Sequence, residues 1–195
     1  MAIKLISDNA TEAVSLLEIK HHLRISTSST GEDLLLSNYL TAARHVAENK
    51  CNRSFVIQTW ELTRDCFPTG GIQLTRPLAT FATSVVLIRY INESSVLTTL
   101  PATAYTIDDR SEPGWIFPSG DNDWPDTLDV VNAVTVTYET GDSTAPEAVK
   151  AWIQVRAGVM YENREAMIID RNLVQELPRN FIDGLLDPYV VVIDV

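Results

Sequence analysis

The first fifty residues place apolar side chains at the spacing of α-helices. Ser15 and Glu18 have the spacing of a capping box, in which two amide donors at a helix start find partners. Thr30 and Asp33 form a second start signal of this kind, and the helix after it is predicted to run to Lys50. The apolar positions of the two helices are Leu16, Ile19 and Leu23 in the first, and Leu36, Tyr39, Leu40, Ala43 and Ala47 in the second.

The spacing then changes to that of β-strands, up to about residue 141. Val56, Trp60 and Leu62 alternate with polar residues, and the segments between the strands are rich in Gly, Pro, Asn and Ser. The strand-like segments are SFVIQTWELTR, IQLTRPL, SVVLIRYI, AYTIDD, GWIFP and VVNAVTVTYETG, with a hairpin predicted around RSEPG. Five or six short strands favour a small antiparallel sheet or barrel.

Helical spacing returns after residue 141. Thr144 and Glu147 suggest a third capping box, with Pro146 in the first turn. The helix over residues 146–162 is too apolar for a lone surface helix, and a short last helix is predicted between Pro178 and Pro188. We therefore expect an α+β fold. Residues 1–54 and 142–188 would form a small helical bundle, residues 55–141 a β-rich antiparallel insertion between the second helix and the later ones, and residues 189–195 an extended tail.

The net charge of the chain argues against one class of function. The net charge of the chain is −11, which argues against a protein that grips nucleic-acid phosphates through a basic stripe. Residues 55–141 alone carry four basic and eleven acidic side chains, so the acidity is concentrated in the strand region. We find no apolar run long enough to span a membrane and no secretion signal, and expect a protein made in the cytoplasm.

No pattern in the sequence points to catalysis. His21 and His22 are adjacent and diverge on a helix, and neither they nor His45 belong to a metal or nucleophile motif. Cys51 and Cys66 are expected to be partly buried free thiols, and the alternative of a disulfide between them has no support from the context. We therefore predict no enzyme activity, no cofactor and no metal.

One acidic loop, SGDNDWPD, leaves an alternative open. Asp121, Asp123 and Asp126 alternate as calcium ligands can, but no bidentate Glu follows at the required distance. A solvated turn is the simpler interpretation, with Trp124 anchoring the loop on the sheet.

The C-terminal segment YVVVIDV is strongly apolar and β-prone. A free strand of this kind pairs with another chain's edge unless something covers it. Two interpretations stay open at this point: the segment is donated to a partner, or it packs on its own domain.

An ordered set of motifs resembles the head–tail connector (adaptor) proteins of tailed bacteriophages. The match runs from about Val14 to Glu165. Its pieces are KHHLRI, EDLLLSNYLTAAR, QTWEL, PGWIFP, WP and YENRE.

The resemblance implies a non-enzymatic virion protein at the capsid vertex. It would form a ring, twelve-fold, below the portal protein, extend the channel for genomic DNA without binding it specifically, and dock the next stopper or tail-completion protein. We expect subunit or portal contacts through Trp152, Tyr161, Glu162, Arg164, Phe181, Leu185, Leu186, Tyr189, Val191 and Ile193. The alternatives are a monomeric β-sheet binding module, a calcium-dependent binding domain or a small hydrolase.

Overall fold

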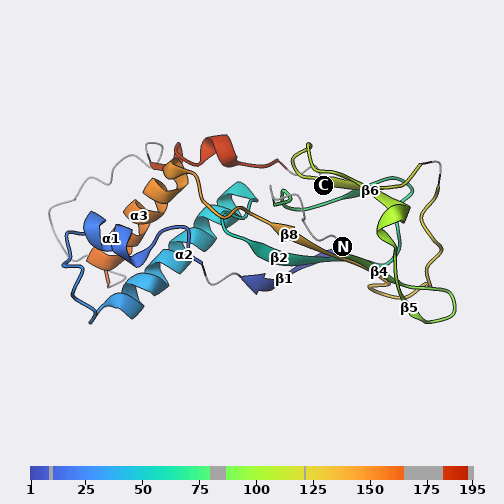
Figure 1. The fold of residues 1–195 in the computed structure, drawn as a ribbon, viewed down its shortest axis with the longest axis horizontal. Helices are drawn as coiled ribbons and strands as arrows, with labels where there is room; N and C mark the ends of the chain where they lie inside the picture. Colours follow the sequence, from blue (N-terminus) through green and yellow to red (C-terminus); the bar gives the residue numbers. More distant parts are fainter. Residues whose placement is uncertain (9–10, 80–86, 121, 165–181, 193–195) are drawn as a thin grey trace, which may run out of the picture. The chain divides into compact units, whose positions relative to one another are not determined.

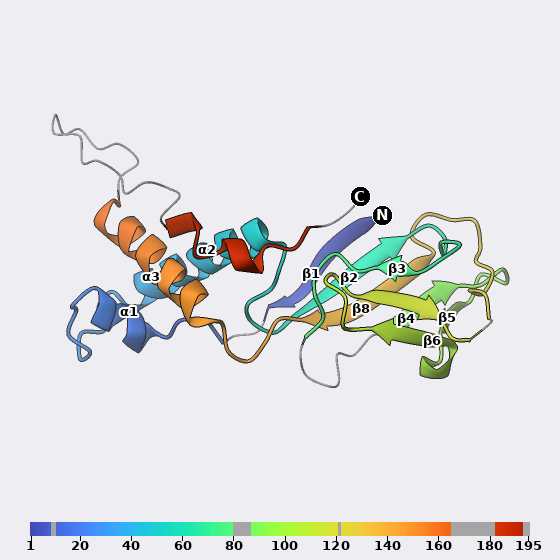
Figure 2. The same cartoon turned by 90° about the horizontal axis from the view of Figure 1, so that it is seen from above.

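The chain forms two compact units. The computed structural model describes residues 1–8, 11–79, 87–120, 122–164 and 182–192. The helical unit consists of Ala10–Cys51 and Thr144–Val190, and the sheet unit of Met1–Asn9, Asn52–Ser143 and Val191–Val195 (Figures 1 and 2). The α+β fold class predicted from the sequence is confirmed.

The helical unit is built on two helices that pack along their apolar faces. Its elements in the described residues are α1 (Leu16–His22), α2 (Asp33–Cys51), α3 (Glu147–Glu162) and the 3-10 turn η2 (Asp187–Tyr189). Both views show α2 and α3 side by side (Figures 1 and 2). The buried apolar residues are Ile19 of α1, Leu36, Leu40, Ala43, Ala47 and Cys51 of α2, and Val149, Trp152, Ile153 and Ala157 of α3. The predicted apolar face of the second helix is confirmed, although Tyr39 is only half-buried.

The helix starts differ in how they are capped. At α1 the predicted capping box is present: the Glu18 amide donates to Ser15 Oγ at 3.2 Å, and the Ser15 amide donates to Glu18 Oε2 at 2.6 Å. The box predicted for α3 is wrong, because Pro146 itself is the N-cap residue and no side chain caps the helix. Thr144 lies two residues before that cap, out of reach of the amides that it was expected to satisfy.

The described residues of the sheet unit form two antiparallel sheets. The five-stranded sheet has the order β1-β2-β8-β4-β5 and the three-stranded sheet the order β3-β7-β6. Their strands are β1 (Ala2–Asp8), β2 (Gln58–Arg64), β3 (Ile72–Gln73), β4 (Leu87–Ile91), β5 (Leu97–Thr99), β6 (Tyr105–Asp108), β7 (Trp115–Pro118) and β8 (Val134–Thr140), with the 3-10 turn η1 at Ala102–Ala104. The predicted hairpin is β6–β7, in which Asp108 lies opposite Trp115.

Register places one face of each sheet in a shared core. Along β8 buried and half-buried residues alternate, as expected for a strand with one covered face. Val136 lies between Leu62 of β2 and Ile88 of β4, and all three are fully buried. The core consists of Leu62, Ile72, Leu74, Ile88, Leu100, Ile116, Val134, Val136 and Tyr138, and so draws on both sheets.

The first strand is the main departure from the sequence-based elements. We expected residues 1–54 to go with the helices, but Ala2–Asp8 pairs with β2 as an edge strand of the larger sheet. Its period-two pattern is weak because Ile3 and Ile6 are both exposed and the register shifts between Leu5 and Ser7. At the other end of the chain, Val191 also groups with the sheet unit.

In the helices that the structure describes, no segment combines the length and the apolar character needed to cross a membrane.

Candidate interaction surfaces

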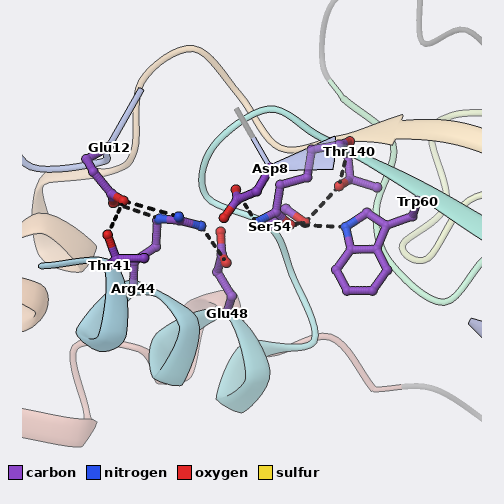
Figure 3. A network of polar contacts seen from close by, with 9 residues as sticks. Asp8, Glu12, Thr41, Arg44, Glu48, Ser54, Trp60 and Thr140 are labelled. Carbon is purple, nitrogen blue, oxygen red and sulfur yellow. Dashed lines mark hydrogen bonds and ion pairs between the residues drawn. The ribbon is translucent and has the colours of Figure 1, made fainter. Parts of the chain in front are cut away.

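A buried polar network holds the helical unit together around Arg44. The guanidinium is 1% exposed, and its Nε donates to Glu12 Oε2 at 2.8 Å and its Nη1 to Glu48 Oε2 at 3.1 Å (Figure 3). The Thr41 hydroxyl donates to Glu12 Oε1 at 2.6 Å. These groups satisfy one another, so the network ties the segment before α1 to α2 and has a structural role.

The sheet unit has a polar network of its own around Gln58. Ser54 Oγ donates to Gln58 Oε1 at 2.7 Å, and Thr140 Oγ1 donates to Ser54 Oγ at the same distance (Figure 3). Gln58 Nε2 donates to Asp8 Oδ1 at 3.1 Å, and Trp60 Nε1 donates to Gln58 Oε1 at 3.0 Å. The side chain of Gln58 is thus a bridge between β1, β2 and β8.

A third cluster joins the end of α3 to the loop before α2. Tyr161 OH donates to Glu32 Oε2 at 2.5 Å, and Arg164 Nη2 donates to Glu32 Oε1 at 2.6 Å. The hydrogen bond from Tyr161, and then that from Arg164, lower the pKa of Glu32. The hydrogen bond between Tyr161 and Glu32 in turn raises the pKa of Tyr161. The structure therefore brings together two predicted contact residues, Tyr161 and Arg164, with a partner that lies 129 positions away from Tyr161 and that sequence reasoning missed.

Other predicted contact residues are buried within their own unit. Trp152 is 2% exposed, and its Nε1 donates to Asp183 Oδ1 at 3.2 Å. Leu186 is 2% exposed, and Val191 is 3% exposed, with its carbonyl accepting from Asn52 Nδ2 at 3.1 Å. These three side chains stabilise the subunit and present no surface to a partner.

The remaining predicted contact residues divide by exposure. Glu162 and Leu185 are exposed, and Tyr189 is half-buried. Phe181 and Ile193 lie outside the described residues. A contact through Glu162, Leu185 or Tyr189 stays a prediction.

The acidic loop is anchored by its tryptophan. Trp124 stacks on Phe67 with ring centroids 4.8 Å apart, and its Nε1 donates to Gly70 O at 2.7 Å. Asp123 and Asp126 are exposed, and Asp121 lies outside the described residues. Across the part of the chain that the structure describes, no three His, Cys, Asp or Glu side chains are grouped as metal ligands.

Neither Cys51 nor Cys66 forms a disulfide in the described residues, in line with the two thiols expected from the sequence. Cys51 is buried at the end of α2, and Cys66 is exposed.

Comparison with known proteins finds one matching family model. Residues 13–100 match the family model described as the phage gp6-like head-tail connector protein. The matched range begins before α1 and ends after β5, so it includes both α1 and α2 and the strands β2 to β5. The resemblance to head–tail connectors that the sequence motifs indicated is therefore confirmed.

Solved structures with a similar fold come from gene transfer agent (GTA) particles. A chain from the neck of an empty GTA particle, computed with C6 symmetry, has a TM-score of 0.78 and 17% identity. Chains from the virion of a native gene transfer agent (GTA) particle and from a native GTA neck computed with C12 symmetry have TM-scores of 0.76 and 0.75, with 18% and 16% identity. Each match covers 100% of this chain and 98% of the other chain. No curated protein matches the sequence.

Proposed function

We propose that this chain is a structural subunit of the neck of a tailed phage or phage-like particle, located between the portal vertex of the head and the tail. The observation that carries the proposal is the connector-family match over residues 13–100 together with a fold shared, along the whole chain, with neck proteins. The role is one of shape and contact. It needs no bond-making chemistry, in line with polar networks whose groups bind one another.

The proposed assembly is a homo-oligomeric ring of twelve subunits. The similar neck chains belong to particles computed with C6 and C12 symmetry, which supports a rotationally repeated subunit. A ring requires a heterologous interface, in which two different surfaces of the same subunit meet around the rotation axis.

The acidity of the chain suits a channel through which DNA slides. A net charge of −11 on each of many subunits repels phosphates, whereas a basic wall would hold them through counterion release. Genomic DNA would therefore pass the ring without specific binding.

The exposed residues Glu162 and Leu185, and half-buried Tyr189, are the proposed contacts to the portal or to the next stopper or tail-completion protein. Val190 and Val192 of the tail are 45% and 75% exposed, so apolar side chains remain available there for a partner. Donation of the tail to a neighbour is part of this proposal.

A direct test mixes the purified chain with the portal protein of the same particle and measures masses by native mass spectrometry. We expect a complex of portal and chain in a rotationally symmetric stoichiometry. Particles made without this chain should have filled heads that lack tails in electron micrographs. A chain that stays monomeric beside the portal, or tailed particles that form without it, would refute the proposed function.

A further inference from the structure

One side of α2 is exposed over its whole length. Leu34, Asn38, Ala42 and Val46 repeat every four residues and define what we name the α2 ridge. Leu34 is 77% exposed and Val46 is 43% exposed, and the other two members of the ridge, Asn38 and Ala42, are also exposed. The ridge lies opposite the buried face that packs on α3, because its members are offset by about half a helical turn from Leu36 and Leu40.

The α2 ridge carries no ionised side chain. The charged residues of α2 are engaged elsewhere within the helical unit: Asp33 with Lys20 at 2.5 Å, Arg44 with Glu12 and Glu48, and Lys50 with Asp183 at 2.7 Å. A solvated helix face ordinarily carries charged residues. A neutral ridge that bears two large apolar side chains is instead what a helix–helix interface uses.

A second ridge with the same spacing lies on α3. Ala151, Val155 and Val159 define the α3 ridge, and Val159 is 45% exposed while the other two are half-buried. None of the three is charged. Ridges formed by residues four apart on two helices interdigitate at a crossing angle of about −50°, the commonest class of helix packing.

We propose that the α2 ridge of one copy packs against the α3 ridge of the next copy in the ring. This inference rests on the proposed function and specifies its subunit interface. Two distinct surfaces on one unit meet the geometric need of a heterologous contact. We infer that the partner of each ridge is a second copy of this chain. Each subunit has a net charge of −11, and two subunits repel one another least where the side chains that meet are uncharged.

The test uses one charged substitution on each ridge. Ala42→Arg and Val159→Arg place a long cation in the middle of the α2 ridge and near the end of the α3 ridge. Thr106→Arg, at an exposed position of β6, is the matched control. Assembly is measured by sedimentation velocity over a concentration series, and folding by circular dichroism.

We expect the wild-type chain and Thr106→Arg to form rings and each ridge variant to remain monomeric. An equimolar mixture of Ala42→Arg and Val159→Arg should produce dimers and nothing larger. Each dimer would join the intact α2 ridge of one variant to the intact α3 ridge of the other, and its outer ridges are both blocked.

Rings formed by both ridge variants would overturn the inference and leave the proposed ring intact. A wild-type chain that stays monomeric throughout the series would overturn the inference alone, because the proposed function is tested separately by mixing the chain with the portal protein. A cysteine pair keeps the inference testable if a charged variant fails to fold. In a Cys66→Ser background, Ala42→Cys mixed with Val159→Cys should give crosslinked dimers with a short bismaleimide, and the absence of the crosslink in assembled rings would refute the contact.

Discussion

Arg44 is a buried cation that forms ion pairs with two carboxylates of the helical unit, those of Glu12 and Glu48. Removing one member of a buried ion pair leaves the other in a medium that solvates it poorly. Glu48 is only 3% exposed, so the side chain of Arg44 offsets a desolvation penalty that water cannot. The same chemistry at the surface is worth far less, because solvent screens it.

Arg44→Met should therefore lower the free energy of unfolding by about 3–5 kcal/mol, measured by urea denaturation. Lys150→Met is the control, since its partner Glu147 is 87% exposed at the side chain, and it should change stability by less than about 1 kcal/mol. Equal effects of the two substitutions would show that burial does not govern these pairs.

Gly141 occupies a backbone conformation that other residues avoid. Its φ is +81°, and a Cβ there would lie 2.0 Å from the Val56 carbonyl oxygen. Gly141→Ala should destabilise the sheet unit by on the order of 2–3 kcal/mol in thermal or urea unfolding. Gly70→Ala, where a Cβ would meet nothing within 4 Å, should stay within about 0.5 kcal/mol of the wild type. A tolerated Gly141→Ala would contradict the close approach of the two backbones at this position.

At the scale of elements, two similar sequence patterns at the starts of helices differ in whether they cap the helix. Ser15 and Thr144 are each followed three residues later by Glu. Ser15→Ala should cost about 1 kcal/mol, because it removes the acceptor of the Glu18 amide. Thr144→Ala should be nearly neutral in the same chemical denaturation experiment, and a loss as large as that of Ser15→Ala would mean that Thr144 does cap α3.

Local sequence patterns predicted the elements that depend on neighbouring residues, but not those that depend on distant ones. The helices, most of the strands and the β6–β7 hairpin follow from spacing and turn residues that lie within a few positions of one another. The capping box at Thr144 failed because Pro146 moved the helix start by its own backbone preference. Strand β1 was missed because its partner β2 begins fifty residues after it ends, and nothing local marks an edge strand with exposed Ile3 and Ile6.

Burial of candidate contact residues was missed for a similar reason. Trp152 and Leu186 are apolar residues that are buried by segments distant in the sequence. Their apolar character alone fitted an interface with a partner as well as a place in the core of the subunit. Glu32, the partner of Tyr161 and Arg164, could not be found from the YENRE motif, because the two segments meet only in the folded unit.

The Glu32 cluster links α3 to the loop before α2 in a pH-dependent way. Hydrogen bonds from Tyr161 and Arg164 lower the pKa of Glu32 in the folded state below its ordinary value of 4.5. A lowered folded-state pKa stabilises the protein above the unfolded-state value, and this contribution is lost as the pH falls through the folded-state pKa. Glu32→Gln should therefore be less stable than the wild type at neutral pH, and the difference should shrink below pH 4.5 in thermal melts. A difference that is constant with pH would exclude the carboxylate as its source.

At the scale of the whole molecule, the start of the tail packs on its own subunit, which is one of the two interpretations that the sequence left open. Val191 is 3% exposed and its carbonyl is bound by Asn52, whereas the next residue, Val192, is 75% exposed. Val191→Ala should cost about 2 kcal/mol in urea unfolding, and Val192→Ala should be close to neutral. If Val191→Ala were also neutral, the anchoring of the tail on the sheet unit would be refuted.

The interleaving of the two units has a consequence for synthesis. The chain passes between them four times, after residues 9, 51, 143 and 190. A ribosome therefore releases β1 first, then both α1 and α2, and only afterwards the β2 strand that β1 must find. The described residues of the sheet unit are complete only after Val191 and Val192 have left the exit tunnel. A prematurely ended polypeptide would thus lack Val191, a buried residue of the unit with which the chain began.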